Sequence, residues 1–394
     1  MKKIYQNFDK MEVTFQCIVP KHIINKIREA QQEAKQLRRD AYIKLGESKA
    51  YIAVAESGMK GGFTYRICTG DDGIIFAIRD SEDPFGWNVK ASISSLMLAI
   101  YGYKETKEKL LSFLIDDLMA KAATSQSIPT ERVSRFDFCI DFLSQKDFVP
   151  DPKCFFVKNR SKKRYQGNIP NLSPLDFFII DQGKDIQTIT IGTMPNRQIT
   201  IYNKSREIKY SQKTYWWNLW GLDSSKTKGD IWRVEVRLGK KELNKWNIRR
   251  FSDFEKKAGD AIIHMLKDYR YVIPNLNDSN RARWRLEPFW QDCIDAAKDY
   301  LAEYICNAER NEIQLILLGE MQKRYHLQLC GMMPGYAACH GYDISEIPAV
   351  LDIAREEIIG TMRSNPKKFQ LNYNKSEKKF EYLQGKKQMP ITTE

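Results

Sequence analysis

The chain has 394 residues, 42% of them hydrophobic and 12% aromatic, and its 63 basic and 50 acidic residues leave a net charge of +13. A chain of this length and composition can form two or three domains with buried cores, so an intrinsically disordered protein is excluded. The sequence contains no run of about 18 apolar residues and begins without the apolar stretch of a signal peptide, which predicts a cytoplasmic protein with no membrane partner. The positive charge favours a polyanionic partner, most often nucleic acid, over a merely solubilising surface.

The first third of the chain has the pattern of an antiparallel α+β unit. Residues 11–20 alternate apolar and polar side chains and end at a proline, which predicts a strand, and residues 21–40 have the composition of a helix. The sequence Gly70-Asp71-Asp72-Gly73 is typical of a hairpin turn. The other predicted elements are hairpin strands at 63–69 and 74–79, a strand at 87–94 and an amphipathic helix at 104–123.

Residues 131–143 form the strongest predicted strand of the chain. Apolar side chains such as Phe136 and Phe138 alternate there with polar ones such as Asp137 and Asp141. One face of this strand is therefore expected to cover a core. The elements predicted after it are strands at 175–180, 187–192 and 197–203, a helix at 205–219, a strand at 231–238 and a helix at 240–267.

The order strand, helix, strands, helix occurs before residue 125 and again after residue 131, which suggests a duplicated unit. From residue 284 onward the pattern is helical, with helices at 284–308, 311–329 and 344–362 and a break at Gly331 to Gly335. Residues 365–394 are polar and lysine-rich, which predicts a flexible tail that either binds phosphates or is simply solvated. The predicted fold class is α+β, with antiparallel sheets packed with helices, a duplicated unit as an option, and a helical C-terminal region.

Three of the predicted strands carry polar residues at every second position, with apolar residues between them. If these strands share a sheet, their polar sides form one surface. A solvent-facing sheet with cross-strand ion pairs, such as Asp137 with Arg233 or Glu235 with Arg197, accounts for the pattern equally well. The polar positions are Asp137 and Asp141 on the first strand, Gln198, Thr200, Tyr202 and Lys204 on the second, and Arg233, Glu235 and Arg237 on the third.

The residue types on this surface suit the cleavage of a phosphodiester. Carboxylates that lie close together repel each other unless a cation separates them, and oxygen ligands suit Mg²⁺ or Mn²⁺, so Asp137, Asp141 and Glu235 are candidate metal ligands. Tyr202 could attack phosphorus, because a nearby cation would lower the high pKa of its phenol. The candidate phosphate-binding residues are Lys204, Arg233 and Arg237.

Four motifs follow one another in the chain: RFDFCID at 135–141, Gly192, IYNKSRE at 201–207 and RVEVR at 233–237. Their order and spacing resemble the trans-acting replication initiator family of rolling-circle plasmids and the related relaxases of conjugative elements, over roughly residues 130–245. The resemblance implies an enzyme that nicks one DNA strand at an origin with a tyrosine and a divalent metal. Such an enzyme stays joined to the DNA as a 5′-phosphotyrosine and leaves a free 3′-hydroxyl.

The predicted domains are a DNA-binding α+β half at 1–125, a nicking α+β domain at 126–270, which contains the resemblance, a helical C-terminal domain at 280–364 and a flexible basic tail at 365–394. The implied cofactor is Mg²⁺ or Mn²⁺, and the implied partner is single- and double-stranded origin DNA. A host helicase, a host polymerase and a second copy of the chain are further candidate partners. The implied site residues are Tyr202, Lys204 and Glu207 for catalysis, Asp137, Asp141 and Glu235 for the metal, and Arg135, Arg197, Arg233 and Arg237 for DNA.

The chain departs from the family at one position. Some relatives carry a second tyrosine within the motif, where this chain has Arg206. If that second tyrosine is the nucleophile, the cutting residue here would be Tyr210 or Tyr215, or the chain would be inactive. The alternation favours Tyr202, because it places this residue on the same face as Lys204. The alternative function is an origin-binding replication protein without chemistry.

Two further segments are candidates for contact with DNA. The segment from Tyr215 to Trp220 is expected to form a helix that packs on the back of the sheet, with a stacking platform for an unpaired base as the alternative. A basic loop with an aromatic residue is a candidate for contact with the DNA backbone. The loop residues concerned are Lys162, Lys163, Arg164 and Tyr165.

Overall fold

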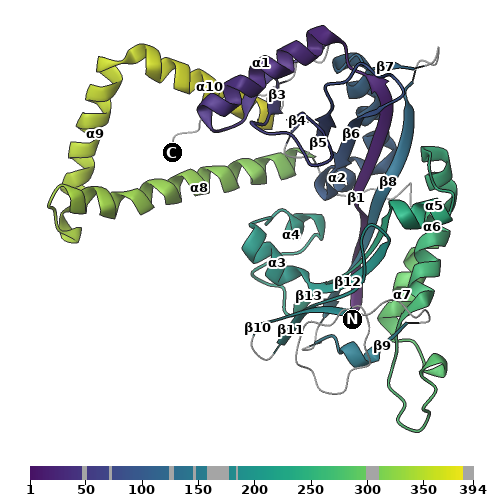
Figure 1. The fold of residues 1–394 in the computed structure, drawn as a ribbon. Helices are drawn as coiled ribbons and strands as arrows, with labels where there is room; N and C mark the ends of the chain where they lie inside the picture. The colour runs from purple at the N-terminus through teal and green to yellow at the C-terminus, as the bar shows by residue number, and fades with distance from the viewer. Residues whose placement is uncertain are drawn as a thin grey trace.

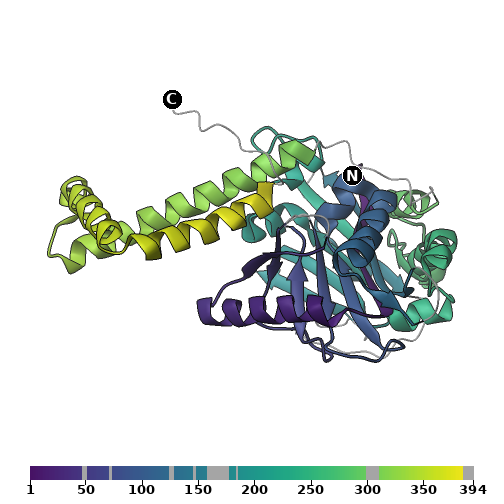
Figure 2. The same ribbon diagram turned by 90° about the horizontal axis from the view of Figure 1, so that it is seen from above.

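The computed structural model describes residues 1–46, 51–70, 73–123, 128–144, 148–157, 177–182, 185–298 and 310–384. The predicted α+β class is confirmed, because antiparallel strands form a large sheet, helices pack against it, and a helical region follows (Figures 1 and 2). None of the helices within these ranges is long and apolar enough to cross a membrane.

The centre of the large sheet is formed by β1 and β8. From β8 the sheet continues through β13, β12, β11 and β10, and from β1 it continues through β6, β5, β4, β3 and β2, while the short β7 pairs with β1 outside this order. The strands are β1 (Lys2–Ile18), β2 (Ala41–Lys44), β3 (Tyr51–Val54), β4 (Tyr65–Cys68), β5 (Ile74–Ile78), β6 (Trp87–Ile93), β7 (Lys121–Ala122), β8 (Thr130–Ser144), β10 (Phe177–Gln182), β11 (Asp185–Thr193), β12 (Arg197–Asn203) and β13 (Asp230–Gly239). A separate small sheet pairs β9 (Phe155–Val157) with β14 (Tyr269–Tyr271).

The two halves of the sheet repeat one order. In each half the last strand, β6 or β13, lies beside the first strand, β1 or β8, and the strands before it follow outward. This order agrees with the duplicated unit that the sequence suggests. The two halves join where β1 pairs with β8, so one continuous sheet crosses the predicted boundary between residues 125 and 126.

The alternation of β8 works as predicted, because its phenylalanines face a core. Phe136 and Phe138 are buried there together with Phe8 of β1 and Phe254 of α6 (Phe251–Asp268). The ring centroids of Phe8 and Phe254, and of Phe136 and Phe254, lie 5.1 Å apart. Figure 1 shows α5 (Lys240–Lys245), α6 and α7 (Pro288–Ala296) together at one side of the sheet. The other side of β8 is thereby left for its polar residues.

Several predicted helices have different limits in the structure. Helix α1 (Lys21–Leu37) agrees with the prediction. Helix α2 (Ser95–Ser112) is kinked at Gly102, where the backbone is not helical, so the part after the kink begins close to the predicted residue 104. The part before the kink was not predicted, and Ser94 caps it by accepting a hydrogen bond from the Met97 amide. The helix expected at 205–219 is divided into α3 (Lys204–Ser211) and α4 (Trp216–Leu219). The helix expected at 240–267 is divided into α5 and α6, and the one at 284–308 is represented in the described residues by α7.

The C-terminal helices correct two predictions. Helix α8 (Arg310–Cys339) continues through Pro334, where a break was predicted. This part of α8 is exposed, so a backbone carbonyl that loses its helical partner at the proline can bind water. After α9 (Ile347–Ser364), residues expected to be flexible form helix α10 (Pro366–Gln384), which returns to β2 and β3 (Figure 1).

Candidate functional site

The register of the central strands gathers the predicted residues on one side of the sheet. On β13, Arg233 lies opposite both Asp141 of β8 and Tyr202 of β12, and Arg237 lies opposite Asp137. The sequence alternation therefore placed these side chains correctly. We call this side of the sheet the polar face, formed by Asp9, Arg135, Asp137, Asp141, Gln198, Thr200, Tyr202, Arg233, Glu235 and Arg237.

The hairpin beside this face depends on Gly192, the glycine of the second motif. Gly192 lies one residue before the end of β11, with a φ of +86°, and a Cβ there would lie 2.3 Å from the carbonyl oxygen of Arg197. Only glycine fits this close approach of the two strands. The hairpin then aligns Thr190 with Thr200, whose hydroxyl oxygens lie 3.2 Å apart.

Arg233 is the centre of the polar face and is completely buried. Its Nε and Nη2 donate hydrogen bonds to the two carboxylate oxygens of Asp141, at 2.7 and 2.8 Å. Its Nη1 donates to Asp9 at 2.5 Å, and its guanidinium lies 4.2 Å from the ring centroid of Trp216. Trp220 donates a further hydrogen bond to Asp141 at 2.8 Å. Each buried charge is thus paired and hydrogen-bonded, as a buried charge must be.

Asp9 joins this cluster because β1 has an irregularity at that residue. The pairing of β1 with β8 shifts between Phe8 and Lys10, so Asp9 is the extra residue of a bulge. Burial acts to raise the pKa of Asp9, but the charges of Arg233, Lys204, Arg237 and Lys213 together outweigh it, so the pKa lies below its usual value. The sequence gives no sign of Asp9, since alternation cannot locate a bulge.

The other two carboxylates pair with arginines of their own strands. Arg135 binds both oxygens of Asp137, at 2.8 and 2.5 Å, and Arg237 binds both oxygens of Glu235, at 2.8 Å each. Arg237 also donates to Gln198 at 3.0 Å. Residues two apart on a strand lie on the same face, which brings each pair together. Neither cross-strand ion pair considered from the sequence, Asp137 with Arg233 or Glu235 with Arg197, is the one formed.

The three predicted metal ligands do not fit a metal ion in this arrangement. Asp137, Asp141 and Glu235 each direct both carboxylate oxygens to a guanidinium. Within the ranges that the structure describes, no group of three or more histidine, cysteine, aspartate or glutamate residues is placed to hold a metal. The positive charge that separates the carboxylates here is supplied by arginine.

Tyr202 and Lys204 lie close together at the end of β12. Tyr202 is on the polar face, and burial raises the pKa of its phenol well above the usual value although Arg233 acts to lower it. Lys204 begins helix α3 instead of continuing the strand, because Asn203 caps the helix by accepting from the Arg206 amide. Its ammonium lies 2.5 Å from Glu207 and 5.7 Å from the Tyr202 ring centroid, and burial and Arg233 lower its pKa.

The alternative tyrosines differ in exposure. Tyr210 is 73% exposed at the end of α3, whereas Tyr215 is buried. The tryptophan segment packs onto the polar face and not onto the back of the sheet, because Trp216 covers Arg233 and Trp220 binds Asp141. Both tryptophans are buried, so neither is a free stacking platform for a base.

The remaining predicted DNA-binding residues are Arg197 and the basic loop. Arg197 is buried on the opposite side of β12, where it forms an ion pair of 2.9 Å with Asp268 and lies 3.8 Å from Glu242. Its position follows from the alternation of β12, in which residue 197 shares a face with Ile199. The basic loop residues Lys162, Lys163, Arg164 and Tyr165 lie outside the described residues.

Four cations form the exposed part of the polar side of the sheet, and we call them the cationic rim: Lys10 of β1, Lys90 of β6, Arg135 of β8 and Arg237 of β13. Their side chains are between 23% and 34% exposed. The carboxylates that they pair with are less exposed, at 2% for Asp137, 5% for Glu235 and 16% for Glu12. The cations therefore lie above the anions, and the surface presented to solvent is positive.

Lys10 and Lys90 are the members of the rim that the sequence did not single out. Both bind Glu12, at 3.1 Å and 2.8 Å. The first strand was predicted to begin at residue 11, but its alternation of polar and apolar residues extends back to Lys10 and could have included it. Lys90 joins the group because β6 pairs with β1, a pairing that the sequence pattern does not specify.

The Asp137 carboxyl predicts a pH dependence of stability. Burial, followed by the nearby charge of Glu235, raises the pKa of Asp137 to about 7. A carboxyl whose pKa is raised on folding stabilises the fold fully below its unfolded pKa and loses that stabilisation as the pH rises through the folded value. Between pH 5 and pH 8, the free energy of unfolding of the wild type should therefore fall by about 2 kcal/mol more than that of Asp137→Asn. Urea unfolding at a series of pH values measures this difference.

The matched control is Glu29→Gln, which removes an exposed carboxyl from α1. Its free energy of unfolding should follow that of the wild type across the same pH range. Parallel curves for the wild type and Asp137→Asn would contradict the raised pKa.

A scan against protein-family models finds no matching family, and a search of curated proteins finds no matching relative. A search of solved structures matches the rolling circle replication initiator protein from Geobacillus stearothermophilus. The sequence identity is 13% and the TM-score is 0.39, and the match covers 77% of this chain and 98% of that one.

Proposed function

We propose that the chain is a DNA-binding initiator of the rolling-circle type, which holds origin DNA on the cationic rim. The observation that carries the proposal is the layering of charge on the polar side of the sheet. The carboxylates of Asp137, Glu235 and Glu12 are less exposed than the cations that cover them, Lys10, Lys90, Arg135 and Arg237. These four side chains come from four neighbouring strands, β6, β1, β8 and β13, so they extend as a row across the sheet.

A row of cations suits a polyphosphate backbone better than it suits a compact anion. Each exposed cation can neutralise one phosphate and release its counterions. The carboxylates beneath hold the guanidinium groups in fixed orientations, which lowers the entropy lost when they bind. The net charge of +13 supports the same partner, because it attracts DNA from a distance.

The test of this function is the affinity of the wild-type chain for duplex DNA at increasing salt concentrations. If the four rim cations contact phosphates of B-DNA, the logarithm of the association constant should fall with the logarithm of salt with a slope of about −3.6 or steeper. Fluorescence anisotropy with a labelled duplex from the origin region of the replicon measures the slope. Binding that does not depend on salt would contradict the proposal.

A second candidate function is strand nicking by Tyr202, which the sequence resemblance implies. The observation that favours it is the position of Tyr202 directly opposite Arg233, with Lys204 5.7 Å from its ring centroid. In this reaction the phenolic oxygen forms a bond to phosphorus, the bond from phosphorus to the 3′ oxygen breaks, and the phenolic proton passes to the departing oxygen. Tyr202 is half-buried, and its phenol, whose pKa is raised, would have to give up its proton during the reaction.

Relaxation of a supercoiled plasmid that carries the origin tests the nicking function, assayed with Mg²⁺ and with Mn²⁺. If Tyr202 is the nucleophile, Tyr202→Phe abolishes relaxation and the covalent protein–DNA adduct, because phenylalanine has no oxygen to bind phosphorus. Tyr210→Phe and Tyr215→Phe are the matched controls and should retain both. Relaxation that persists in Tyr202→Phe would remove this residue as the nucleophile, and its loss in Tyr210→Phe would assign the reaction to the exposed tyrosine.

A further inference from the structure

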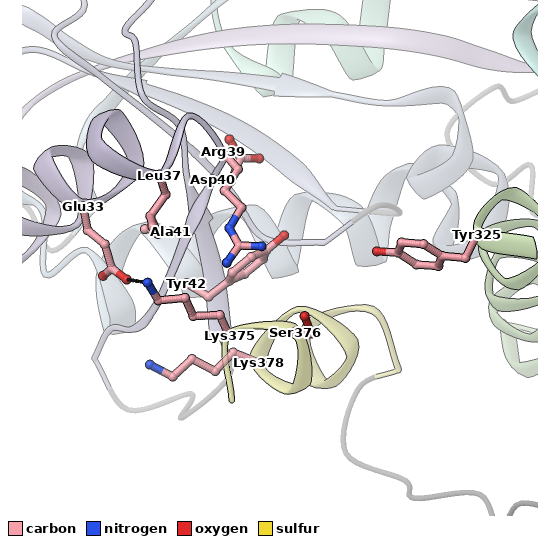
Figure 3. Close-up of a pocket in the computed structure, with 10 residues that line it drawn as sticks. All are labelled: Glu33, Leu37, Arg39, Asp40, Ala41, Tyr42, Tyr325, Lys375, Ser376 and Lys378. Atoms are coloured by element: carbon pink, nitrogen blue, oxygen red, sulfur yellow. Dashed lines mark ion pairs between the residues drawn. The ribbon is translucent and has the colours of Figure 1, made fainter. Parts of the chain in front are cut away.

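A second basic site lies far from the polar face along the sheet, where helix α10 returns to the body of the protein. A pocket of 370 Å³ opens there between the end of α1, strand β2, helix α8 and helix α10 (Figure 3). This volume is within the range of roughly 300–1,000 Å³ that is usual for small-ligand sites. Strand β2 is the outermost strand of its half of the sheet, at the opposite end from β10.

The lining of this pocket combines cations with aromatic rings. Arg39 comes from the link between α1 and β2, and Tyr42 comes from β2. Lys375 and Lys378 come from α10, and Tyr325 comes from α8. Figure 3 shows Tyr325 on the opposite side of the pocket from Glu33 and Lys375. Three parts of the chain that are distant in sequence therefore supply one site.

The charges of the lining leave one positive charge in excess. The cations are Arg39, Lys375 and Lys378, and the anions are Glu33 and Asp40, so three positive charges face two negative ones. Glu33 is already engaged, since its carboxylate lies 3.8 Å from the ammonium of Lys375. Among the described residues Arg39 forms no ion pair of 4.0 Å or less, and its side chain is exposed. An exposed guanidinium that is not paired with a carboxylate can bind a phosphate through two parallel hydrogen bonds.

We propose that this pocket binds one nucleotide of a single DNA strand. The phosphate would bind Arg39 and Lys378, and the base would stack on Tyr42 or Tyr325. Aromatic side chains stack on any base, and cations beside them bind the backbone without regard to sequence. The single excess charge matches the single charge of a phosphodiester. The inference rests on the proposed function in that DNA is the ligand, but the site is separate from the cationic rim.

The expected result is a loss of affinity for single-stranded DNA in two pocket variants. Arg39→Ala and Tyr325→Ala should each weaken the binding of a labelled oligo(dT) by about tenfold, which is the usual effect of removing one stacking or phosphate contact. The matched controls are Arg38→Ala and Tyr373→Ala, because Arg38 precedes Arg39 and Tyr373 is an exposed tyrosine of α10, and neither lines the pocket. Fluorescence anisotropy gives the affinities, and circular dichroism checks that each variant is folded.

A cross-linking measurement gives a readout that net charge cannot produce. An oligo(dT) that contains 5-iododeoxyuridine should cross-link to Tyr42 or Tyr325, as mapped by mass spectrometry of the digested protein. Competition with free dTMP shows whether the pocket binds a DNA strand or a free nucleotide. If dTMP competes weakly, the ligand is a DNA strand. If dTMP competes as strongly as the oligonucleotide, the proposal of a DNA strand is wrong and the ligand is a free nucleotide. Equal losses in Arg38→Ala and Arg39→Ala would overturn the pocket altogether.

The proposed nucleotide site and the proposed function can be tested separately. The pocket variants are expected to bind duplex DNA with the wild-type salt dependence, because the cationic rim is intact in them. If the wild type binds oligo(dT) through the pocket but binds no duplex DNA, the initiator function is wrong and the pocket stands. The pocket variants could instead bind oligo(dT) as the wild type does, while the binding of duplex DNA depends on the cationic rim. In that case the proposed nucleotide site is wrong and the proposed function stands.

Discussion

Arg233→Met should lower the free energy of unfolding by about 3–5 kcal/mol, the usual cost of leaving a buried charge without its partner. Methionine fills much of the arginine volume, but it donates no hydrogen bond to Asp141 or Asp9. Asp141 is completely buried, and of its hydrogen bonds to the described residues it would keep the one from Trp220. The substitution also removes the contact between the guanidinium and the Trp216 ring, whose centroid lies 4.2 Å away. Chemical unfolding followed by circular dichroism measures the change.

Two variants show whether the cost comes from the uncompensated carboxylates. Arg66→Met removes an exposed arginine from β4 and should change the free energy of unfolding by less than about 0.5 kcal/mol. The double variant Arg233→Met with Asp141→Leu removes both charges and should be more stable than Arg233→Met alone. A double variant that is less stable than the single one would attribute the loss to packing and contradict the electrostatic explanation.

Replacing both rim lysines with glutamine should weaken the binding of duplex DNA by about tenfold or more at low salt. Lys10 and Lys90 both bind Glu12, and glutamine can still donate a hydrogen bond to that carboxylate while it carries no charge. Two phosphate contacts are then lost, so the salt dependence should become less steep by about 1.8 in the slope of the log–log plot. Anisotropy titrations of the same duplex at several salt concentrations measure both quantities.

The control for this variant removes two lysines from elsewhere on the surface. Lys21 and Lys226 are more than 80% exposed, and each is paired with a carboxylate, so Lys21→Gln with Lys226→Gln makes the same change in net charge. Its slope should equal that of the wild type. Equal losses of affinity in the two double variants would mean that DNA responds to net charge alone, and the rim would not be its binding surface.

Much of the polar face could be predicted from the sequence, because a strand has a period of two residues. The strands β8, β12 and β13 lie where the alternation of their residues placed them, and the register brings Tyr202, Arg233 and Asp141 together as expected. By the same rule Arg197, which precedes Gln198 of the polar face, lies on the opposite side of β12 with Ile199. The pattern was therefore sufficient to identify which side chains share a face.

The pairing within the face could not be predicted, since alternation says nothing about distance or exposure. Each carboxylate of the expected metal set had several cations within reach on the same face, and the structure selects Arg135 for Asp137 and Arg233 for Asp141. Asp9 entered the cluster only through a bulge. Helix α10 had the composition of a solvated tail, and it is held by contacts with β2 and β3, which are distant in sequence.

The position of β1 in the middle of the sheet has a consequence for synthesis of the protein. β1 leaves the ribosome well before its partners β6 and β8, which end at Ile93 and Ser144. Until both have been made, a long strand with apolar side chains such as Phe8 and Phe15 has no neighbour on either edge. Pairing across such a separation is slow, and unpaired strands of this kind aggregate readily. The nascent chain should therefore depend on chaperones until β8 emerges, and slower translation at low temperature should increase the yield of folded protein.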